Sequence, residues 1–277
     1  MTVLQRTATY IPSADRQLFT LLSLPRGEAK GIVVHVPPFA EEMNKSRRML
    51  TLTTEALVEA GWMVVLFDLT GCGDSSGGLE DVSWEMWIED LDNVIEWCAA
   101  AYPELELNLW CLRGGALIAS DWLARNRRPC NAVLLWQPVL SGKLQLTQFL
   151  RLKAANSMLS EADARSAVAE IRKRLDQGQS VDIAGYCIST KFAKGMAGAN
   201  FSVDGCGPRK LGVVEIGGGA NGAFSPAIEA AIAKWESNGC RVLCEKVVGP
   251  AFWGTPYIRT VPELVHVSRR FLEQLQV

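Results

Sequence analysis

The segment from Leu107 to Ser120 constrains the fold more than any other part of the chain. It reads LNLWCLRGGALIAS, in which a mostly apolar run is followed by one polar side chain, Arg113, and then by two glycines. Ala116 begins an alanine- and leucine-rich pattern with helical spacing. Consecutive glycines permit a tight turn and a close approach of the two flanking elements. The segment therefore predicts a buried strand, a hard turn and a helix in direct succession.

This arrangement has the outline of a nucleophile elbow, the G-x-S-x-G motif whose turn holds a serine above the carboxyl end of a strand. The chain carries Arg113 at the place of the serine and Cys111 at the place of the first glycine. A guanidinium group stays protonated and has no lone pair to offer, so Arg113 cannot act as a nucleophile. The sequence predicts the scaffold of a hydrolase without its reacting hydroxyl.

The rest of the chain alternates between short apolar runs and amphipathic helical patterns, which predicts a mostly parallel sheet with helices on both faces. Strands are expected at 4–10 and 16–24, as an antiparallel edge, and at 31–36, 62–67, 105–112, 131–138, 211–216 and 241–248. Helices are expected at 49–60, after Ser83 with Met86 in the capping position, up to 125 after the elbow, and at 144–157, 161–177, 226–237 and 262–275. The rhythm changes between 141 and 210, which predicts a cap inserted into a core made of 1–140 and 211–277.

Composition favours a folded protein with little attraction to nucleic acid or anionic membranes. Of 277 residues, 48% are hydrophobic, and the formal net charge is -2. The chain begins without an apolar signal segment and has no run long enough to span a membrane, so we expect a cytoplasmic protein whose eight cysteines are reduced. With only His35 and His266 and no C-x-x-C pair, no metal or other cofactor is expected.

Several strings carry a resemblance to a known family. They are VPPFAEEMNKSRR at 36–48, DLTGCGDS at 68–75, the pair Leu112-Arg113, AGY at 184–186 and PAFW at 250–253. Together with the order of strands and helices, they resemble the exosortase A system-associated hydrolase 2 type of the α/β-hydrolase superfamily. The resemblance covers nearly the whole chain. It implies the α/β-hydrolase fold with a helical cap, and a bacterial protein of the exosortase, PEP-CTERM and exopolysaccharide system.

In that fold the catalytic triad follows the chain order Ser, then Asp or Glu, then His. The serine place is Arg113. The acid place should follow the strand at 211–216, but GGGANG at 217–222 has no carboxylate, and Glu215 lies inside the strand. The histidine place, GPAFWGT at 249–255, contains no histidine. The sequence therefore predicts a pseudoenzyme on a hydrolase scaffold.

Charged residues in two predicted loops are the nearest candidates for chemistry around Arg113. The loop at 37–48 carries Glu41, Glu42, Lys45, Arg47 and Arg48, and the loop at 68–78 carries Asp68 and Asp74. Both loops leave carboxyl ends of parallel strands, where ligands bind in open α/β sheets. Either Arg113 is neutralised by Glu42 or one of the two aspartates, or its donors join the helix N-terminus in binding a carboxylate or phosphate. The residues leave both interpretations open.

Two functions remain in competition. The first is an accessory protein that binds a small anionic or acyl molecule. Its expected ligand-binding residues are Arg113, Gly114, Phe39, Glu41, Phe252 and Trp253. The alternative is a hydrolase or acyltransferase that acts on an ester or thioester by an unconventional mechanism. Its expected catalytic residues are Glu42 or Asp74 as a general base on water and Cys72 as a thiol nucleophile.

Other reactive side chains are expected to have structural roles. His35 should be hydrogen-bonded to nearby backbone, His266 should be a surface or packing residue on the last helix, and Cys111 should be a buried small hydrophobe. A third hypothesis, a protein-interaction module in polysaccharide assembly that uses the cap as its contact surface, has no specific residue pattern in its favour.

Overall fold

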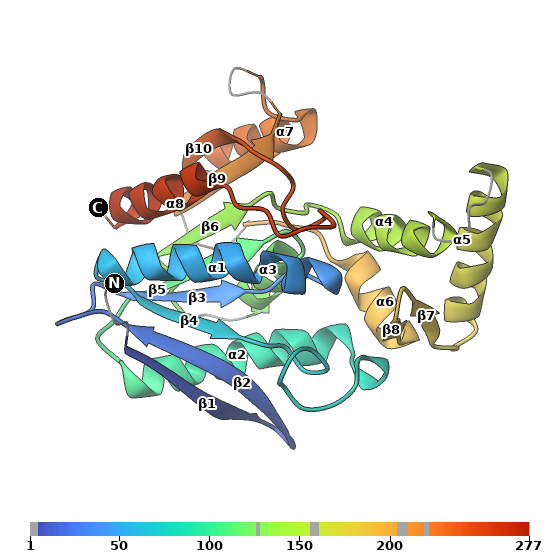
Figure 1. Cartoon of the computed structure of the whole chain (residues 1–277), viewed down its shortest axis with the longest axis horizontal. Coiled ribbons are helices and arrows are strands. Elements are labelled where there is room, and N and C mark those ends of the chain that lie inside the picture. The colour runs from blue at the N-terminus through green and yellow to red at the C-terminus, as the bar shows by residue number, and fades with distance from the viewer. Residues whose placement is uncertain (1–4, 126–127, 156–160, 204–209, 219–221, 277) are drawn as a thin grey trace.

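The computed structural model describes residues 5–125, 128–155, 161–203, 210–218 and 222–276. Its centre is an eight-stranded sheet with the order β1-β2-β4-β3-β5-β6-β9-β10 (Figure 1). The strands are β1 (Gln5–Ser13), β2 (Arg16–Leu24), β3 (Ile32–Val36), β4 (Met63–Phe67), β5 (Leu107–Leu112), β6 (Ala132–Trp136), β9 (Lys210–Gly217) and β10 (Arg241–Val248). The β1-β2 hairpin is antiparallel and pairs antiparallel to β4, whereas the other strands are parallel. The predicted sheet, with its antiparallel edge, is confirmed.

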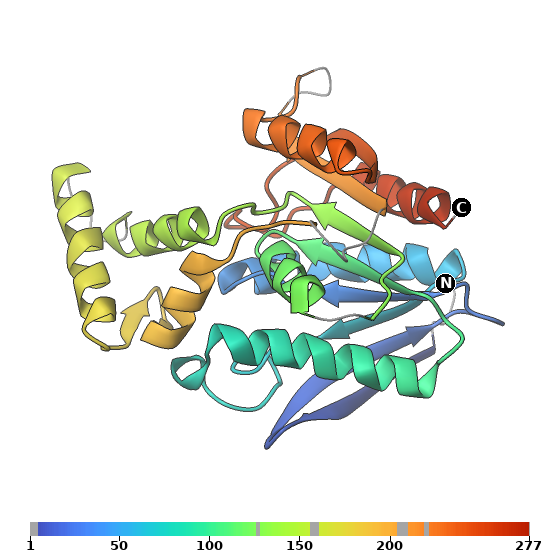
Figure 2. The same ribbon diagram turned by 180° about the vertical axis from the view of Figure 1, so that it is seen from behind.

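Helices cover both faces of this sheet, as the two opposite views show (Figure 1, Figure 2). The helices of the core are α1 (Glu41–Glu59), α2 (Trp84–Ala101), α3 (Gly115–Arg125), α7 (Pro226–Ser237) and α8 (Pro262–Leu275). Buried side chains of α1 and α8 pack on one face, and those of α2, α3 and α7 pack on the other. Strands β3, β5 and β6 are buried along their whole length, as expected for central strands of a sheet covered on both sides.

The remaining elements form a lobe beyond the carboxyl ends of the parallel strands (Figure 2). They are α4 (Gly142–Ala155), α5 (Glu161–Asp176), β7 (Val181–Ile183), β8 (Tyr186–Ile188) and α6 (Thr190–Gly198), and we call them the cap lobe. Its two ends meet at a β-bridge between Ser141 and Asn200. The division of the chain at 141 and 210 stays a prediction, and 204–209 lies outside the described residues.

Two sequence expectations for helices were wrong. Helix α1 begins at Glu41 rather than near residue 49, so the expected charged loop at 37–48 is mostly helical. Acidic residues suit a first helical turn because of the helix dipole, and Met43, Ser46 and Met49 supply a buried stripe at helical spacing.

No helix or strand was expected between residues 177 and 211, but this stretch contains the β7-β8 hairpin and α6. The oxygen of Ser189 caps α6 by accepting a hydrogen bond from the Phe192 amide at 3.0 Å. Burial of Phe192 and Met196 then outweighs the low helix propensity of its glycines.

The cap lobe contacts the core through a buried aromatic cluster. Phe192 of α6 lies 5.3 Å from Phe39, which follows β3, and 4.5 Å from Trp87 of α2, measured between ring centroids. Phe149 of α4 packs on Phe39 at 4.6 Å. A hydrogen bond from the Ser189 hydroxyl to the carbonyl of Val82 adds to this contact. The space between the cap lobe and the β3-α1 turn is thus filled by aromatic side chains.

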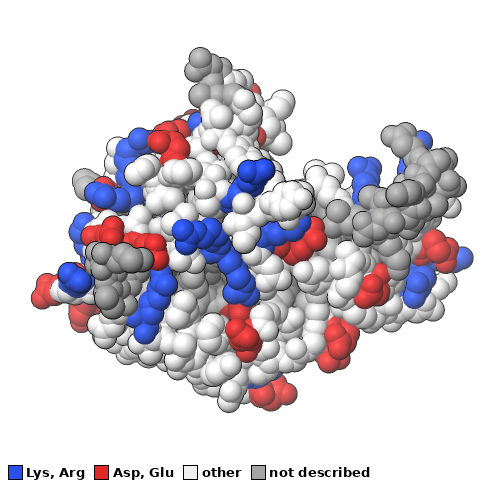
Figure 3. Space-filling view, viewed as in Figure 1, with Lys and Arg blue, Asp and Glu red and all other residues white. Residues whose placement is uncertain are grey.

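Surface charge is mixed rather than segregated. Acidic and basic side chains are interspersed over the face shown in Figure 3, in keeping with the formal net charge of -2. None of the helices in the described ranges is long and apolar enough to cross a membrane. Cys72, Cys98, Cys111, Cys130, Cys187 and Cys244 are free thiols, and Cys206 lies outside the described residues.

We expect Gly195→Ala to loosen the cap lobe from the core. A Cβ atom at Gly195 would lie 2.2 Å from the Cβ of Trp84, so α6 or α2 must shift. The expected loss is about 1–3 kcal/mol in the free energy of unfolding, measured by urea denaturation. Gly198→Ala, on the same helix but with no atom within 4 Å of the added Cβ, is the control and should change little. Equal losses in the two variants would contradict this close contact.

Candidate functional site

The turn between β5 and α3 has the expected elbow geometry. Arg113 at its apex has a left-handed φ of 52°, its amide donates to the Trp136 carbonyl at 3.0 Å, and its own carbonyl accepts from Val139 at 3.2 Å. A Cβ at Gly115 would lie 2.2 Å from the carbonyl oxygen of Val36, so only glycine fits there. The predicted strand, turn and helix are confirmed, and the second glycine is explained by the close approach of α3 to β3.

The Arg113 side chain is held by groups from three separate elements. Its Nε donates to Oε1 of Glu42 in α1 at 3.1 Å, and its Nη2 donates to Oε1 of Gln145 in α4 at 3.5 Å. The guanidinium carbon lies 5.4 Å from the ring centroid of Trp253, in the loop between β10 and α8. Arg113 and Glu42 keep 17% and 16% of their side-chain surface exposed. Of the three carboxylates considered as partners, Glu42 is the one that pairs with Arg113.

The carboxylate of Glu42 is poorly compensated. Burial raises its pKa, and the charge of Arg113 with hydrogen bonds from Arg113 and Gln145 only partly opposes that shift. Within the described ranges, Oε2 of Glu42 is buried without a hydrogen-bond partner. A second hydrogen-bond donor to Oε2 would therefore stabilise the ionised carboxylate, whereas protonation of Glu42 would remove the buried charge.

Backbone strain gathers around the elbow. Of the five described non-glycine residues with positive φ, Ala14 and Ala184 lie in hairpin turns. The other three are Ala40 (φ 55°), Arg113 (φ 52°) and Gln137 (φ 43°), which follow the neighbouring strands β3, β5 and β6. Gln137 is held there by hydrogen bonds to β9: its amide donates to Val214 and its side-chain oxygen accepts from Ile216, each at 2.7 Å. Such strain persists where surrounding structure enforces it, and it is concentrated at functional sites.

Two backbone amides beside the elbow lack a hydrogen-bond acceptor in the described part of the chain. The amide nitrogen of Phe39 lies 4.0 Å from the position that a Cβ of Gly114 would occupy. Neither the Phe39 amide nor the Gly114 amide donates a hydrogen bond to another described residue. The Phe39 ring is buried in the aromatic cluster, and the Cβ atom of Phe39 lies 3.9 Å from the same position.

The other candidate catalytic residues lie away from Arg113. Asp74 has an exposed side chain, while its amide donates to the buried carboxylate of Asp68 at 3.1 Å. Burial raises the pKa of the Cys72 thiol to about 12, so this thiol stays protonated near neutral pH. Glu41 faces Lys45, 3.9 Å away on the same helix. None of these side chains shares a hydrogen bond or ion pair with Arg113 in the described part of the chain.

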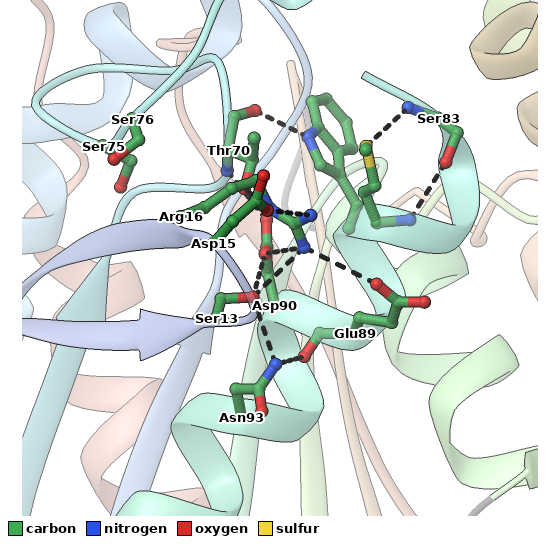
Figure 4. A network of polar contacts seen from close by, with 12 residues as sticks. Ser13, Asp15, Arg16, Thr70, Ser75, Ser76, Ser83, Glu89, Asp90 and Asn93 are labelled. Carbon is green, nitrogen blue, oxygen red and sulfur yellow. Dashed lines mark hydrogen bonds and ion pairs between the residues drawn. The ribbon is translucent and has the colours of Figure 1, made fainter. Parts of the chain in front are cut away.

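A buried polar network fixes the loop that carries Asp68, Cys72 and Asp74 (Figure 4). Asp90 of α2 is fully buried, and its carboxylate accepts from the Thr70 amide at 2.8 Å and the Ser13 hydroxyl at 2.9 Å. Arg16 lies 3.4 Å from the same carboxylate and also donates to the Thr70 hydroxyl at 3.1 Å. Asp90 was not among the predicted functional residues, although an aspartate beside Leu91 on the apolar face of a helix is itself a signal of a buried partner.

The remaining predicted residues fall into the core or onto the surface. Nδ1 of His35 donates to the Trp110 carbonyl at 2.9 Å, and burial lowers the pKa of His35 to about 3, which confirms its expected backbone contact. His266 is exposed on α8, and Cys111 is fully buried, as expected. Phe252 has no exposed surface and packs behind Trp253 with ring centroids 5.1 Å apart. Of the two aromatic residues predicted in this loop, only Trp253 contacts Arg113 in the described structure.

Comparisons with solved structures agree with the overall fold. The chain resembles the solved structure of Est1E from Butyrivibrio proteoclasticus with bound ferulic acid, at a TM-score of 0.66 and 15% identity over 97% of this chain and 99% of that chain. A highly thermostable carboxyl esterase from Bacillus coagulans gives a TM-score of 0.65 at 16% identity over 100% of both chains. Proline iminopeptidase from Mycobacterium smegmatis gives 0.62 at 13% identity, over 98% of this chain and 99% of that chain. Identities this low show a shared fold.

Sequence comparison supplies the family. No curated protein is similar enough in sequence to give a significant match. The family described as "Serine aminopeptidase, S33" matches residues 27–182, which is more than half of the chain. The matched region begins just before β3, includes the elbow and ends in the cap lobe. The chain therefore belongs to this serine aminopeptidase family and has the α/β-hydrolase fold.

Proposed function

We propose that the elbow binds a small carboxylate or phosphate and that this protein is an accessory, non-hydrolytic member of its family that lacks the Ser-His-Asp triad. The observation that carries the proposal is Arg113 at the apex of an intact elbow, where the fold otherwise presents a nucleophile. The sequence resemblance further supports a role in the exosortase and exopolysaccharide system, where the bound group belongs to an acyl or other anionic intermediate.

The chemistry around the elbow suits an anion. Arg113 offers a planar fork of donors, and the amides of Phe39 and Gly114 lie beside it at the start of α3. Glu42 already places one carboxylate oxygen 3.1 Å from Nε of Arg113, so a carboxylate of suitable shape fits this position. An incoming anion exchanges with Glu42 rather than entering an empty site.

The Glu42 exchange makes binding sensitive to pH. When the ligand takes over Arg113, Glu42 loses its main compensating charge, and its raised pKa rises further. Binding is then coupled to proton uptake by Glu42, so affinity increases as pH falls through the pKa of this residue. Simple attraction of an anion to an exposed arginine would not depend on the protonation of Glu42. The pH dependence of affinity therefore distinguishes the two modes of binding.

Calorimetric titration with butyrate tests both points. We expect Arg113→Ala to weaken binding by about tenfold or more, equal to about 1.4 kcal/mol, because the charged donors are removed. Glu42→Gln should bind more tightly than the wild type near pH 8, and its affinity should vary less as the pH is lowered. Unchanged affinity in Arg113→Ala, or a pH dependence that persists in Glu42→Gln, would contradict the proposal.

One observation favours a second candidate function. Glu42 combines a raised pKa with an unpartnered, buried carboxylate oxygen, which are properties of a general base acting on water. Acyl esters and thioesters of several chain lengths, assayed with the wild type, Glu42→Gln and Cys72→Ala, test this alternative. Turnover abolished by Glu42→Gln alone would establish a hydrolase or acyltransferase, and turnover absent from the wild type would leave the binding function.

A further inference from the structure

A second hollow of different chemistry lies within the cap lobe. Helices α4, α5 and α6 line a cavity of about 200 Å³ that opens to solvent. Its floor is apolar and includes Leu146, Leu175 and Ala193, which are 8%, 5% and 3% exposed. The cavity is separate from the elbow. Gln145 of α4 contacts Arg113, whereas the next residue, Leu146, lines the cavity. Successive residues of a helix point about 100° apart, so one helix serves both regions with different faces.

The rim of this cavity is basic. Lys143 of α4, Arg172 of α5 and Lys194 of α6 all line it, and one acid, Asp176 of α5, lies among them. In the described part of the chain, neither lysine forms an ion pair. Arg172 donates to the Thr147 hydroxyl of α4, which holds its guanidinium across the boundary between two helices. Three cations from three helices therefore surround one apolar hollow with a single carboxylate to oppose them.

We infer that this cavity binds an amphiphilic anion, with a phosphate or carboxylate head held by Lys143, Arg172 and Lys194 and a short alkyl chain lying on Leu146 and Leu175. Three cations on separate helices favour an anionic head, and the buried leucines favour an apolar tail. A volume of about 200 Å³ corresponds to about seven water volumes, which suits a chain of about six carbons.

The probe for the test is n-hexyl phosphate, followed by the methyl NMR signals of Leu146 and Leu175. We expect saturable shifts of these signals. Inorganic phosphate alone lacks the alkyl chain and 1-hexanol alone lacks the anionic head, so both should give weaker responses. Lys194→Glu should weaken the binding by about tenfold or more, since it reverses one of three converging charges. Lys191→Glu is the matched control: the same helix carries this exposed lysine, but it does not line the cavity.

The outcomes separate this site from the elbow. In Arg113→Ala, the leucine signals should still respond to n-hexyl phosphate, because Arg113 contacts Gln145 of α4 and does not line the cavity. Shifts that disappear in Arg113→Ala but persist in Lys194→Glu would place the probe at the elbow and overturn the inference. Equal losses of affinity in Lys191→Glu and Lys194→Glu would indicate general electrostatic attraction of the probe and would also overturn the inference. Absence of any leucine shift in the folded wild type would do the same.

Discussion

Replacing Asp90 with alanine is expected to destabilise the protein by about 3–5 kcal/mol in the free energy of unfolding. Asp90 is fully buried, and its carboxylate satisfies the Thr70 amide and the Ser13 hydroxyl while it faces Arg16. Alanine leaves the guanidinium of Arg16, which is 13% exposed, without its buried counter-charge. It also leaves a buried backbone donor unpaired, which carries a further desolvation cost.

Urea denaturation followed by tryptophan fluorescence measures this loss, and Glu89→Ala is the matched control. Glu89 precedes Asp90 on α2 and also lies near Arg16, at 3.5 Å, but its side chain is 62% exposed. An exposed ion pair contributes about 0–1 kcal/mol, so this control should remain close to the wild type. Asp90→Asn keeps one acceptor oxygen, so its stability should lie between those of Asp90→Ala and Glu89→Ala. This variant preserves the test if Asp90→Ala does not fold. Similar stabilities for Glu89→Ala and Asp90→Asn would argue against a buried charge at the centre of the network.

The same network has a consequence for the candidate site. Thr70 belongs to the loop between β4 and α2, which also carries Asp68, Cys72 and Asp74. Tying this loop to α2 and to the β1-β2 hairpin keeps the Cys72 thiol in its buried position, where its pKa is high. Loosening of the loop in Asp90→Asn is therefore expected to increase labelling of Cys72 by iodoacetamide.

Features specified by neighbouring residues could be predicted from the sequence. The elbow follows from an apolar run, two glycines and a helical pattern, and its geometry is confirmed. The cap of α2 is equally local: Ser83 accepts from the Met86 amide at 3.2 Å, and its own amide donates to the Met86 sulfur at 3.4 Å. In both cases the signal and the contact lie within a few residues of each other.

Contacts between distant segments could not be predicted in the same way. The sequence offered Glu42, Asp68 and Asp74 as partners of Arg113, and the choice depends on where α1 begins. Because α1 starts at Glu41, its first turn places Glu42 against the elbow, whereas Asp68 pairs with Arg47 at 3.7 Å. Gln145, which completes the surroundings of Arg113, comes from the cap lobe, and no local pattern predicts how that lobe packs on the core.

Acid should destabilise the wild type through His35, and this is the second large effect that we expect. Burial lowers the pKa of His35 from 6.5 to about 3, so the folded protein keeps the ring neutral while the unfolded chain takes up a proton near pH 6.5. The folded state then binds fewer protons than the unfolded state, and stability falls as pH drops from about 6.5 towards 3. Each pH unit in the middle of this window costs about 1.4 kcal/mol, which approaches about 4 kcal/mol near pH 3.5.

Comparison with variants isolates this contribution. Glu42 and Asp68 have pKa values raised by burial, so their contributions to stability change in the opposite direction, increasing as pH falls. Both carboxylates remain in His35→Gln, which removes only the titrating ring. His35→Gln is expected to start below the wild type at pH 7, because the ring contact with Trp110 is lost, and to lose less stability on acidification. His266→Gln changes an exposed ring and should follow the wild-type curve.

The outcome also bears on chemistry at the elbow. His35 lies in β3, three positions before the Pro38-Phe39 turn beside the elbow. Its Nδ1–H donates to the Trp110 carbonyl, and its Nε2 is buried without a partner among the described residues. A ring that resists protonation down to about pH 3 cannot act as a general base near neutral pH. If the stability curves of His35→Gln and the wild type were parallel between pH 7 and pH 4, His35 would be accessible to protons, and its exclusion from catalysis would have to be withdrawn.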